Sequence, residues 1–239
     1  GWNAAAMEFR SCSGEMNRAR RMYHSGETED IGFVVRRLIE RQPGIQLYVA
    51  GYSLGGNVTA KWFGENGDGL PENVRAGAVI SAPYDLVTSG KHMDSTISRL
   101  YVLHFLRKLV PKAVEKDRMH PGIIDIERVK RARTFREFDD HATAPLHGFV
   151  DAHDYYTRVG CGRFLEGVRR PLLLLSADDD PFNPGKTLPR ELVARQPYLH
   201  AEFTRYGGHC GFIERAQGRT VSWAEEQVVR FFEAYRTRL

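Results

Sequence analysis

The chain contains the three residue types that together perform acyl transfer: a serine between glycines, an aspartate and a histidine. Ser53 stands in Gly51-Tyr52-Ser53-Leu54-Gly55, which has the spacing Gly-x-Ser-x-Gly. This spacing is typical of a sharp turn from a strand into a helix that exposes the serine hydroxyl, and glycine is favoured where side chains would collide in that turn. A serine hydroxyl is a poor nucleophile at neutral pH and needs a base within hydrogen-bond reach. The motif therefore predicts a nucleophile, provided that its neighbours supply the strand, the helix and the base.

The residues on both sides of the motif predict the required elements. Residues 45–50, Ile-Gln-Leu-Tyr-Val-Ala, form a short apolar run after Pro43-Gly44, as a buried strand would. A mixed apolar and polar segment follows Ser53 and ends at Gly64 and Gly67, which is typical of a helix. The positive end of this helix would point at the serine. Strand, turn and helix are thus predicted in the order that a nucleophile turn needs.

Candidate acids and a candidate base follow the serine along the chain. Asp178-Asp179-Asp180 comes directly after the apolar segment 172–177, and His209 follows the segment 199–206. Because the carboxyl ends of parallel strands meet at one sheet edge, we expect these residues to lie near Ser53. The chain has nine histidines, so a histidine alone means little. The glycine-flanked position of His209 after a strand favours a catalytic base over a structural loop histidine.

The three aspartates leave the identity of the acid partly open. Asp180 is the strongest candidate because it stands immediately before Pro181 and lies furthest into the turn. Asp179 is the alternative acid, and either Asp178 or Asp179 would also cap that turn. A calcium site made from all three carboxylates is not favoured, because no ligand loop with EF-hand spacing accompanies them. We expect no metal and no cofactor.

The apolar periodicity predicts strands that alternate with helices, and hence a mostly parallel, doubly wound sheet of the α/β class. We expect about five strands, near 4–9, 45–51, 76–82, 172–177 and 199–206. We expect helices over 27–42, near 187–195 and over 221–239. The segment 85–160 has helical patterns and no strong strand signal. We interpret residues 1–239 as a single domain with a helical lid insertion at about 85–160.

Composition and charge limit the classes of protein that fit. Apolar residues make up 42% of the chain and charged residues 27%, as in globular proteins. The chain has no apolar run long enough to span a bilayer, no visible signal peptide, and only three cysteines without disulfide or zinc spacing. These features predict a cytoplasmic location.

The net charge of +4 is unevenly distributed, because residues 99–136 carry eleven Lys or Arg and four Asp or Glu. This pattern favours a solvated helical surface. The alternatives are transient contact of the lid with an anionic membrane surface and contact with an acidic partner. The basic residues lack the aromatic interleaving typical of nucleic-acid binding, so we expect no nucleic-acid partner.

Several motifs, taken together with the Ser53 turn, carry a resemblance to a known family. They are residues 10–15, 23–30, 51–57, 81–83, 135–140, 178–182 and 207–209. With these motifs the chain resembles the YheT-like branch of the α/β-hydrolases, which groups bacterial esterases with eukaryotic abhydrolase-domain lipases. The resemblance implies an α/β-hydrolase fold and a serine hydrolase that cleaves small-molecule carboxylic esters with short-to-medium acyl groups, monoacylglycerols among them. It assigns the acid to Asp180, and Ser53 and His209 then act as nucleophile and base, with the backbone N–H of Leu54 as an oxyanion donor.

The resemblance also sets an expectation about the part of the fold upstream of Ser53. The sheet of this family usually has eight strands, and a His-Gly-type loop before the nucleophile supplies a second oxyanion donor. The only His-Gly pair in this chain is His147-Gly148, which follows Ser53. We therefore expect a partial α/β-hydrolase fold, from an N-terminally truncated member that is weakly active or inactive by itself. The alternative function is a non-catalytic binding protein with the same fold.

Overall fold

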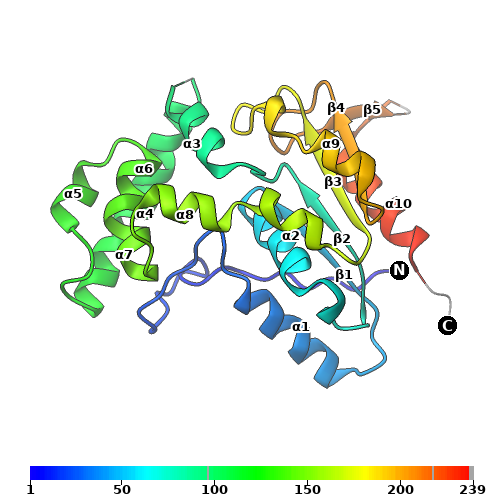
Figure 1. The fold of residues 1–239 in the computed structure, drawn as a ribbon, viewed down its shortest axis with the longest axis horizontal. Coiled ribbons are helices and arrows are strands. Elements are labelled where there is room, and N and C mark those ends of the chain that lie inside the picture. The colour runs from blue at the N-terminus through cyan, green and yellow to red at the C-terminus, as the bar shows by residue number, and fades with distance from the viewer. Residues whose placement is uncertain (96, 217, 237–239) are drawn as a thin grey trace. The chain divides into compact units, whose positions relative to one another are not determined.

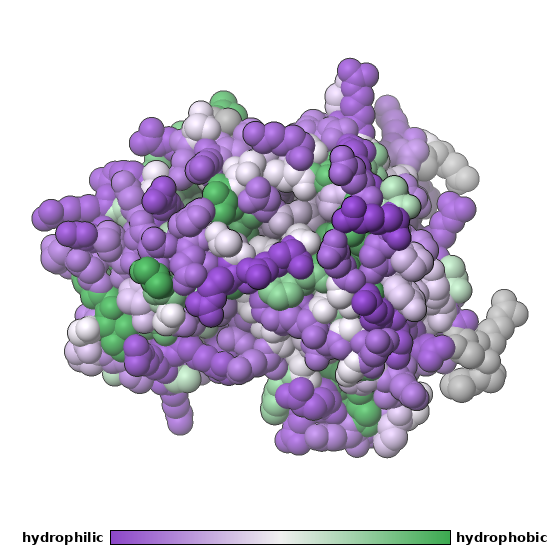
Figure 2. Space-filling model, viewed as in Figure 1, coloured by the Kyte–Doolittle hydropathy of each residue, from purple (hydrophilic) through white to green (hydrophobic). Residues whose placement is uncertain are grey.

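The computed structural model describes residues 1–95, 97–216 and 218–236. The chain divides into two compact units, whose elements are labelled in Figure 1. The helical unit consists of Gly1–His24 and Gly90–Arg158, and the sheet unit of Ser25–Ser89 and Val159–Leu239. None of the helices in the described part of the chain combines the length and apolar composition needed to cross a membrane. On the face drawn in Figure 2, hydrophilic side chains predominate and apolar ones gather in small groups.

The sheet unit contains four parallel strands in the order β1-β2-β3-β4. The strands are β1 (Leu47–Tyr52), β2 (Val74–Ile80), β3 (Leu172–Ala177) and β4 (Leu199–Thr204). β3 is buried along its whole length, which explains the apolar run at 172–175. Tyr52 pairs with Ile80, Ile80 with Leu175, and Leu175 with Glu202. The four strands therefore end at the same edge of the sheet, where the polar residues that follow them can meet.

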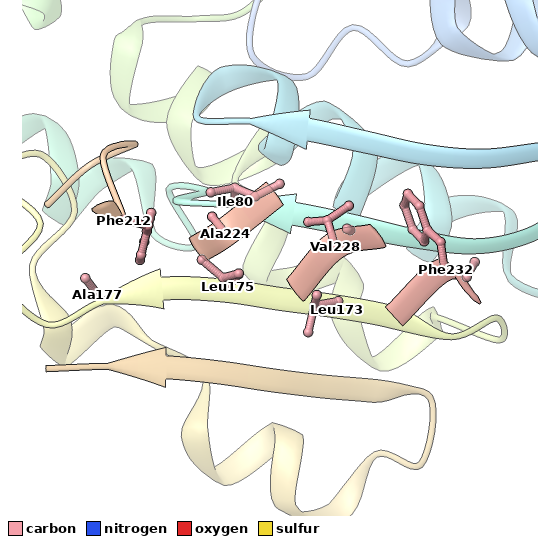
Figure 3. Close-up of a cluster of buried hydrophobic side chains, with 10 residues drawn as sticks. Ile80, Leu173, Leu175, Ala177, Phe212, Ala224, Val228 and Phe232 are labelled. Atoms are coloured by element: carbon pink, nitrogen blue, oxygen red, sulfur yellow. The ribbon is translucent and has the colours of Figure 1, made fainter. Parts of the chain in front are cut away.

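Helices cover both faces of the sheet. On one face, α10 (Trp223–Ala234) packs Val228 and Phe232 into a cluster with alternate residues of β2 and β3 (Figure 3). α2 (Leu54–Asn66) contacts β1 and β2, and a Cβ at Gly77 would meet the ring of Phe63 from this helix. Because side chains alternate along a strand, α2 lies on the face opposite α10. The unit also contains α1 (Glu29–Arg41), α9 (Arg190–Arg195) and the 3-10 turns η1 (Gly67–Gly69), η3 (Cys161–Gly167) and η4 (Gly185–Thr187).

The helical unit is built around α4 (Arg99–Met119). Its other elements are α5 (Ile126–Arg131), α6 (Phe135–Phe138), the π turn η2 (Asp139–Thr143), α7 (Ala144–His147) and α8 (Ala152–Val159), and α3 (Leu86–Ser95) joins the two units. The buried Lys116 Nζ of α4 donates to the carbonyls of Asn17 and Ala19, at 2.6 and 2.8 Å. These bonds tie the segment before α1 to α4. A role of the helices as a lid stays a prediction.

The α/β class and the parallel sheet are confirmed, and two local predictions are wrong. No strand forms near residues 4–9; residues 1–6 are exposed, and the three alanines there favour strand formation only weakly. The sequence did not predict the hairpin of β5 (Ile213–Ala216) and β6 (Arg219–Ser222). This hairpin takes Val221 and Ser222 from the expected C-terminal helix, so that α10 begins at Trp223. The expected end of that helix, 237–239, lies outside the described residues.

Candidate active site

Ser53 stands between β1 and α2 in a backbone conformation that few residues adopt, with φ 51° and ψ −117°. Its N–H donates to the carbonyl of Ile80 on the neighbouring strand at 2.8 Å, and its carbonyl accepts from the N–H of Asn57 at 3.0 Å. Backbone strain of this kind persists only where the surroundings hold it, and it is concentrated at functional sites. Here a strand on one side and a helix on the other fix the serine in the turn.

The glycines around Ser53 differ in why they are needed. A Cβ at Gly51 would lie 2.3 Å from the carbonyl oxygen of Gly55 and 2.6 Å from Thr59 Oγ1, so no other residue fits. A Cβ at Gly55 itself would meet nothing within 4 Å. At Gly56 it would lie 3.1 Å from the Cβ of Ala82. Steric collision therefore explains the glycine at position 51 and not the glycine at position 55. At Gly55 it is the backbone carbonyl that a side chain on residue 51 would strike.

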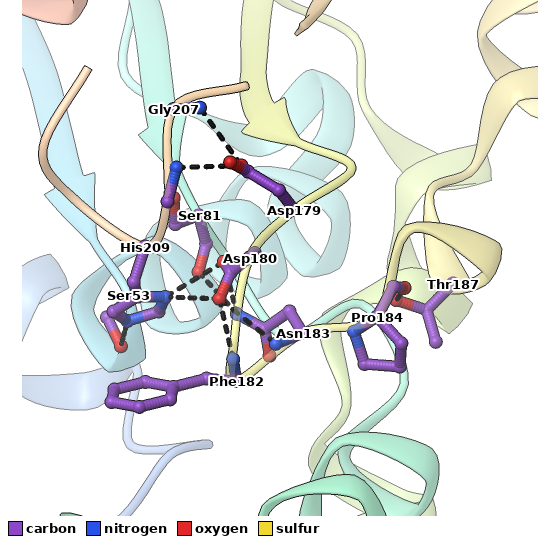
Figure 4. A network of polar contacts seen from close by, with 11 residues as sticks. Ser53, Ser81, Asp179, Asp180, Phe182, Asn183, Pro184, Thr187, Gly207 and His209 are labelled. Atoms are coloured by element: carbon purple, nitrogen blue, oxygen red, sulfur yellow. Dashed lines mark hydrogen bonds and ion pairs between the residues drawn. The ribbon is translucent and has the colours of Figure 1, made fainter. Parts of the chain in front are cut away.

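The structure brings together the three residues that the sequence proposed for acyl transfer (Figure 4). His209 Nε2 lies 2.8 Å from Ser53 Oγ. His209 Nδ1 lies 3.0 and 2.9 Å from the two carboxylate oxygens of Asp180. The side chain of Asp180 is 1% exposed and that of His209 is 15% exposed. With Nδ1–H donating to Asp180, the free lone pair of Nε2 faces the serine hydroxyl and can accept its proton.

Asp180 is held by donors that the sequence did not reveal. Its Oδ1 accepts the backbone N–H groups of Phe182 and Asn183 at 2.8 and 3.1 Å. The Asn183 amide lies 3.3 Å from Oδ2 and also donates to the carbonyl of Ser81 at 2.9 Å. Ser81 follows β2 and has a positive φ of 53°. The turn after β3 is thereby anchored to the end of β2, and the carboxylate has little freedom to rotate away from His209.

The other two aspartates have separate partners. Asp179 accepts the N–H groups of Gly207 and Gly208 at 2.9 and 2.8 Å, and so fixes the turn that precedes His209. Asp178 forms an ion pair with Arg190 at 2.6 Å, in which both side chains are about half exposed. The geometry therefore favours Asp180 as the acid and gives Asp179 a role in shaping the loop. The three carboxylates face three different groups.

The two glycines before His209 shape the loop that carries it. A Cβ at Gly207 would lie 2.4 Å from the ring of Phe212 and 3.1 Å from the Cβ of Ala177. Gly208 adopts a left-handed φ of 63°, which favours glycine although a Cβ there would meet no atom within 4 Å. Packing against β3 and a left-handed turn together place His209 at the sheet edge.

The surroundings of His209 make it a strong proton acceptor. Burial lowers the pKa of its imidazole. The hydrogen bonds and charges of Asp180 and Cys210 more than offset this effect and raise the pKa from 6.5 to about 9. The ring of Phe182 lies against the imidazole, with 4.4 Å between ring centroids, and limits its movement. Leu54 is the first residue of α2, where a backbone N–H has no partner within the helix and can bind a developing negative charge.

The fold and this arrangement define a class of protein. A serine at a strained strand-to-helix turn, followed by an aspartate and then a histidine after later parallel strands, is the arrangement of the α/β-hydrolases. A family model described as "Serine aminopeptidase, S33" matches residues 18–210. The chain is also 37% identical over 237 residues to the Escherichia coli (strain K12) protein named "Putative esterase YheT", covering 98% of this chain and 69% of that protein. The chain belongs to this α/β-hydrolase family and to its YheT-like branch.

Two further comparisons are consistent with this assignment. The monoacylglycerol lipase of Saccharomyces cerevisiae is 30% identical over 241 residues, which cover 98% of this chain and 53% of the yeast protein. The chain thus spans about half the length of that relative. The solved structure of the Pyrococcus furiosus esterase Pf2001 matches with a TM-score of 0.50 over 90% of this chain and 65% of that one. At 15% identity this second likeness concerns the fold alone.

Proposed function

We propose that this protein is a serine hydrolase that cleaves carboxylic esters of small molecules through an acyl-enzyme on Ser53. The observation that carries the proposal is the unbroken hydrogen-bonded chain from Ser53 Oγ through His209 to the buried Asp180. The names of two relatives, an esterase and a monoacylglycerol lipase, support an ester as the bond that is cleaved.

In the first half of the reaction, Ser53 Oγ attacks the ester carbonyl carbon while His209 Nε2 takes the hydroxyl proton. The carbonyl oxygen becomes an oxyanion, which the backbone N–H of Leu54 at the positive end of α2 stabilises. Asp180 holds the imidazole in the tautomer that accepts at Nε2 and stabilises the imidazolium that forms. The bond to the alcohol oxygen then breaks, and His209 returns the proton to the leaving alcohol.

In the second half, water replaces the alcohol. His209 takes a proton from the water as its oxygen attacks the acyl carbon, and a second oxyanion forms at the same place. The bond to Ser53 Oγ breaks, His209 gives the proton back to that oxygen, and the carboxylic acid leaves. No group beyond water is consumed, and the serine hydroxyl is regenerated.

We further propose esters with short-to-medium acyl groups as substrates, with monoacylglycerols among them. The support is the name of the yeast relative, which shares 30% identity with this chain. The family model carries the name of an aminopeptidase, so an amide substrate belongs in the same test.

The test is a panel of p-nitrophenyl esters of increasing acyl length, a monoacylglycerol and an aminoacyl amide, incubated with the purified chain. We expect slow release of the alcohol from the esters, in line with the weak activity that the sequence predicts, with a burst of product equal to the enzyme concentration if deacylation is slow. Ser53→Ala removes the nucleophile and should abolish turnover. Ser89→Ala is the matched control, because Ser89 is a buried serine of the same unit, placed in α3.

Three results would contradict the proposal in different ways. Ester turnover that survives Ser53→Ala would exclude the acyl-enzyme on this residue. Cleavage of the amide and not of the esters would replace ester hydrolysis by peptidase activity. Saturable binding of an ester without turnover would favour a non-catalytic binding protein.

A further inference from the structure

The helix α4 exposes a row of large apolar side chains. Ile97, just before the helix, is 78% exposed, and Leu100, Tyr101 and Phe105 are 67%, 52% and 39% exposed. Their spacing is i, i+3, i+4 and i+8, which places them on one side of the helix. The opposite side of α4 already packs into the helical unit through other residues, namely Val102, Leu106, Ala113 and Lys116. The exposed row is therefore a second face and not the core face of the helix.

The row continues onto a neighbouring helix. The ring of Phe105 lies 5.9 Å from the ring of Phe135 at the start of α6, centroid to centroid. We name these five residues, Ile97, Leu100, Tyr101, Phe105 and Phe135, the α4 surface. Single exposed apolar residues are ordinary on a soluble protein, but contiguous large ones mark a site of interaction.

The charge beside the α4 surface is positive along residues 97–114 and mixed at Phe135. The backbone of Phe135 forms a hydrogen bond with Asp94, and Glu137 lies close to that carboxylate. Between positions 97 and 114 the sequence has no Asp or Glu, and it has four basic residues, Arg99, Arg107, Lys108 and Lys112. Arg107 and Lys108 are exposed, and in the described part of the chain neither forms an ion pair. Acidic residues stand only at the two ends of this stretch, at Asp94 and Glu115. Unpaired positive charge next to exposed apolar side chains is what an anionic lipid surface attracts.

We propose that the α4 surface binds an anionic membrane surface, with α4 lying in the plane of the interface. Leu100 and Ile97 would enter the boundary between headgroups and acyl chains. Tyr101 and Phe105 would lie at headgroup level, where aromatic rings are favoured, and Arg107 and Lys108 would pair with lipid phosphates. This proposal does not depend on the hydrolysis proposed above.

The test is co-sedimentation of the full chain with vesicles of phosphatidylcholine alone and of phosphatidylcholine with about one third phosphatidylglycerol. We expect binding to the anionic vesicles that weakens with added salt, and much weaker binding to the neutral ones. The double variant Leu100→Glu, Tyr101→Glu should lower the partition coefficient about tenfold or more. Arg107→Glu with Lys108→Glu should lower it on anionic vesicles and leave the weak binding to neutral vesicles unchanged.

Two matched control variants distinguish binding through the α4 surface from non-specific binding to vesicles. Val150→Glu changes an apolar residue of the same unit that is 89% exposed and stands between α7 and α8 in the chain, outside the α4 surface as defined. Arg131→Glu removes an exposed charge of the same basic segment on α5. Both should bind like the unchanged chain, and circular dichroism should show that every variant is folded. Absence of vesicle binding by the unchanged chain, or equal binding by the Leu100→Glu, Tyr101→Glu variant, would overturn the proposal. So would a dimer in sedimentation velocity that only this variant dissociates, since the surface would then bind a second copy.

Discussion

Two aspartates, one in each unit, show how the groups around a carboxylate decide what it can do. Asp180 in the sheet unit accepts backbone and amide N–H groups and pairs with His209. Asp139 in the helical unit accepts the hydroxyls of Thr143 and Tyr156. Burial raises the pKa of Asp139 to about 6, although the two hydroxyl donors act to lower it.

The difference lies in the donors and in the neighbouring charges. N–H groups from a fixed turn and an adjacent imidazole suit an anion, so Asp180 can orient and stabilise an imidazolium. The neighbours of Asp139 include the further carboxyl groups of Asp140 and Asp94, which also raise its pKa. A carboxyl group in such surroundings links η2 to α8 through Tyr156 but is poorly suited to stabilise a cation. The surroundings of the same residue type thus suit the proposed chemistry in one unit and a structural link in the other.

The largest expected effect is on kcat, and it should distinguish Asp180 from Asp139. Asp180→Asn should lower kcat for an ester by about 10⁴-fold, because the amide favours the wrong imidazole tautomer while leaving the geometry intact. Asp139→Asn should leave kcat unchanged. Initial rates with a p-nitrophenyl ester measure both, and equal losses in the two variants would contradict the comparison.

A smaller effect is expected from the residue that anchors the turn of Asp180. Asn183→Ala removes the hydrogen bonds that the side-chain amide makes to the Ser81 carbonyl and to the Asp180 carboxylate. It should lower kcat about 10- to 10²-fold with little change in KM. Asn73→Ala is the matched control, because Asn73 also donates to two backbone carbonyls in this unit, those of Pro43 and Ile45. A loss of kcat of the same size in both variants would mean that Asn183 contributes only to general stability.

The pH dependence of kcat/KM should also change in an Asp180 variant and not in an Asp139 variant. His209 must be neutral to accept the serine proton, so kcat/KM should rise with pH through the pKa of His209. Because Asp180 raises this pKa, the midpoint should lie above 6.5, towards about 9. In Asp180→Asn the midpoint should move to lower pH, and in Asp139→Asn it should not move. NMR titration of the His209 imidazole gives the pKa directly, including in variants that are too slow to assay.

The smallest effect concerns stability, and we expect it at Asp139 rather than at Asp180. A carboxyl group whose pKa is about 6 in the folded chain and 3.8 in the unfolded chain binds more protons when folded. The free energy of unfolding should therefore fall as pH rises from about 4 to about 6, by up to about 2 kcal/mol from this group. Asp139→Asn should remove that part of the pH dependence. Urea unfolding of the unchanged chain and the variant at several pH values measures the difference, and identical pH profiles would contradict the structural role.

The candidate site was predictable because each of its parts has a local signal. Ser53, Asp180 and His209 each stand within a few residues of the end of a predicted strand, and parallel strands bring their carboxyl ends to one edge. Three short-range patterns therefore predict one long-range cluster. The same logic predicts the central strands, whose apolar runs are unambiguous.

The features that the sequence did not reveal depend on contacts between distant residues. Asn183 binds the carbonyl of Ser81, which lies 102 positions away, and nothing in either local sequence points to the other. Residues 4–9 have an apolar run but form no strand, so the pattern alone was misleading. The hairpin at 213–222 has polar strands, and Phe212 beside it is buried against the sheet. Such elements are decided by what they pack against and not by their own periodicity.

The most direct test of the central claim is the covalent labelling of the chain by a fluorophosphonate, with the modified residue located by mass spectrometry. An activated serine should react once per chain at Ser53, and the reaction should slow strongly in Asp180→Asn but not in Asp139→Asn. Ser53→Ala should take up no label. Labelling at another residue, or equal rates in Asp180→Asn and the unchanged chain, would contradict the assignment of Ser53 as a nucleophile activated through His209 and Asp180.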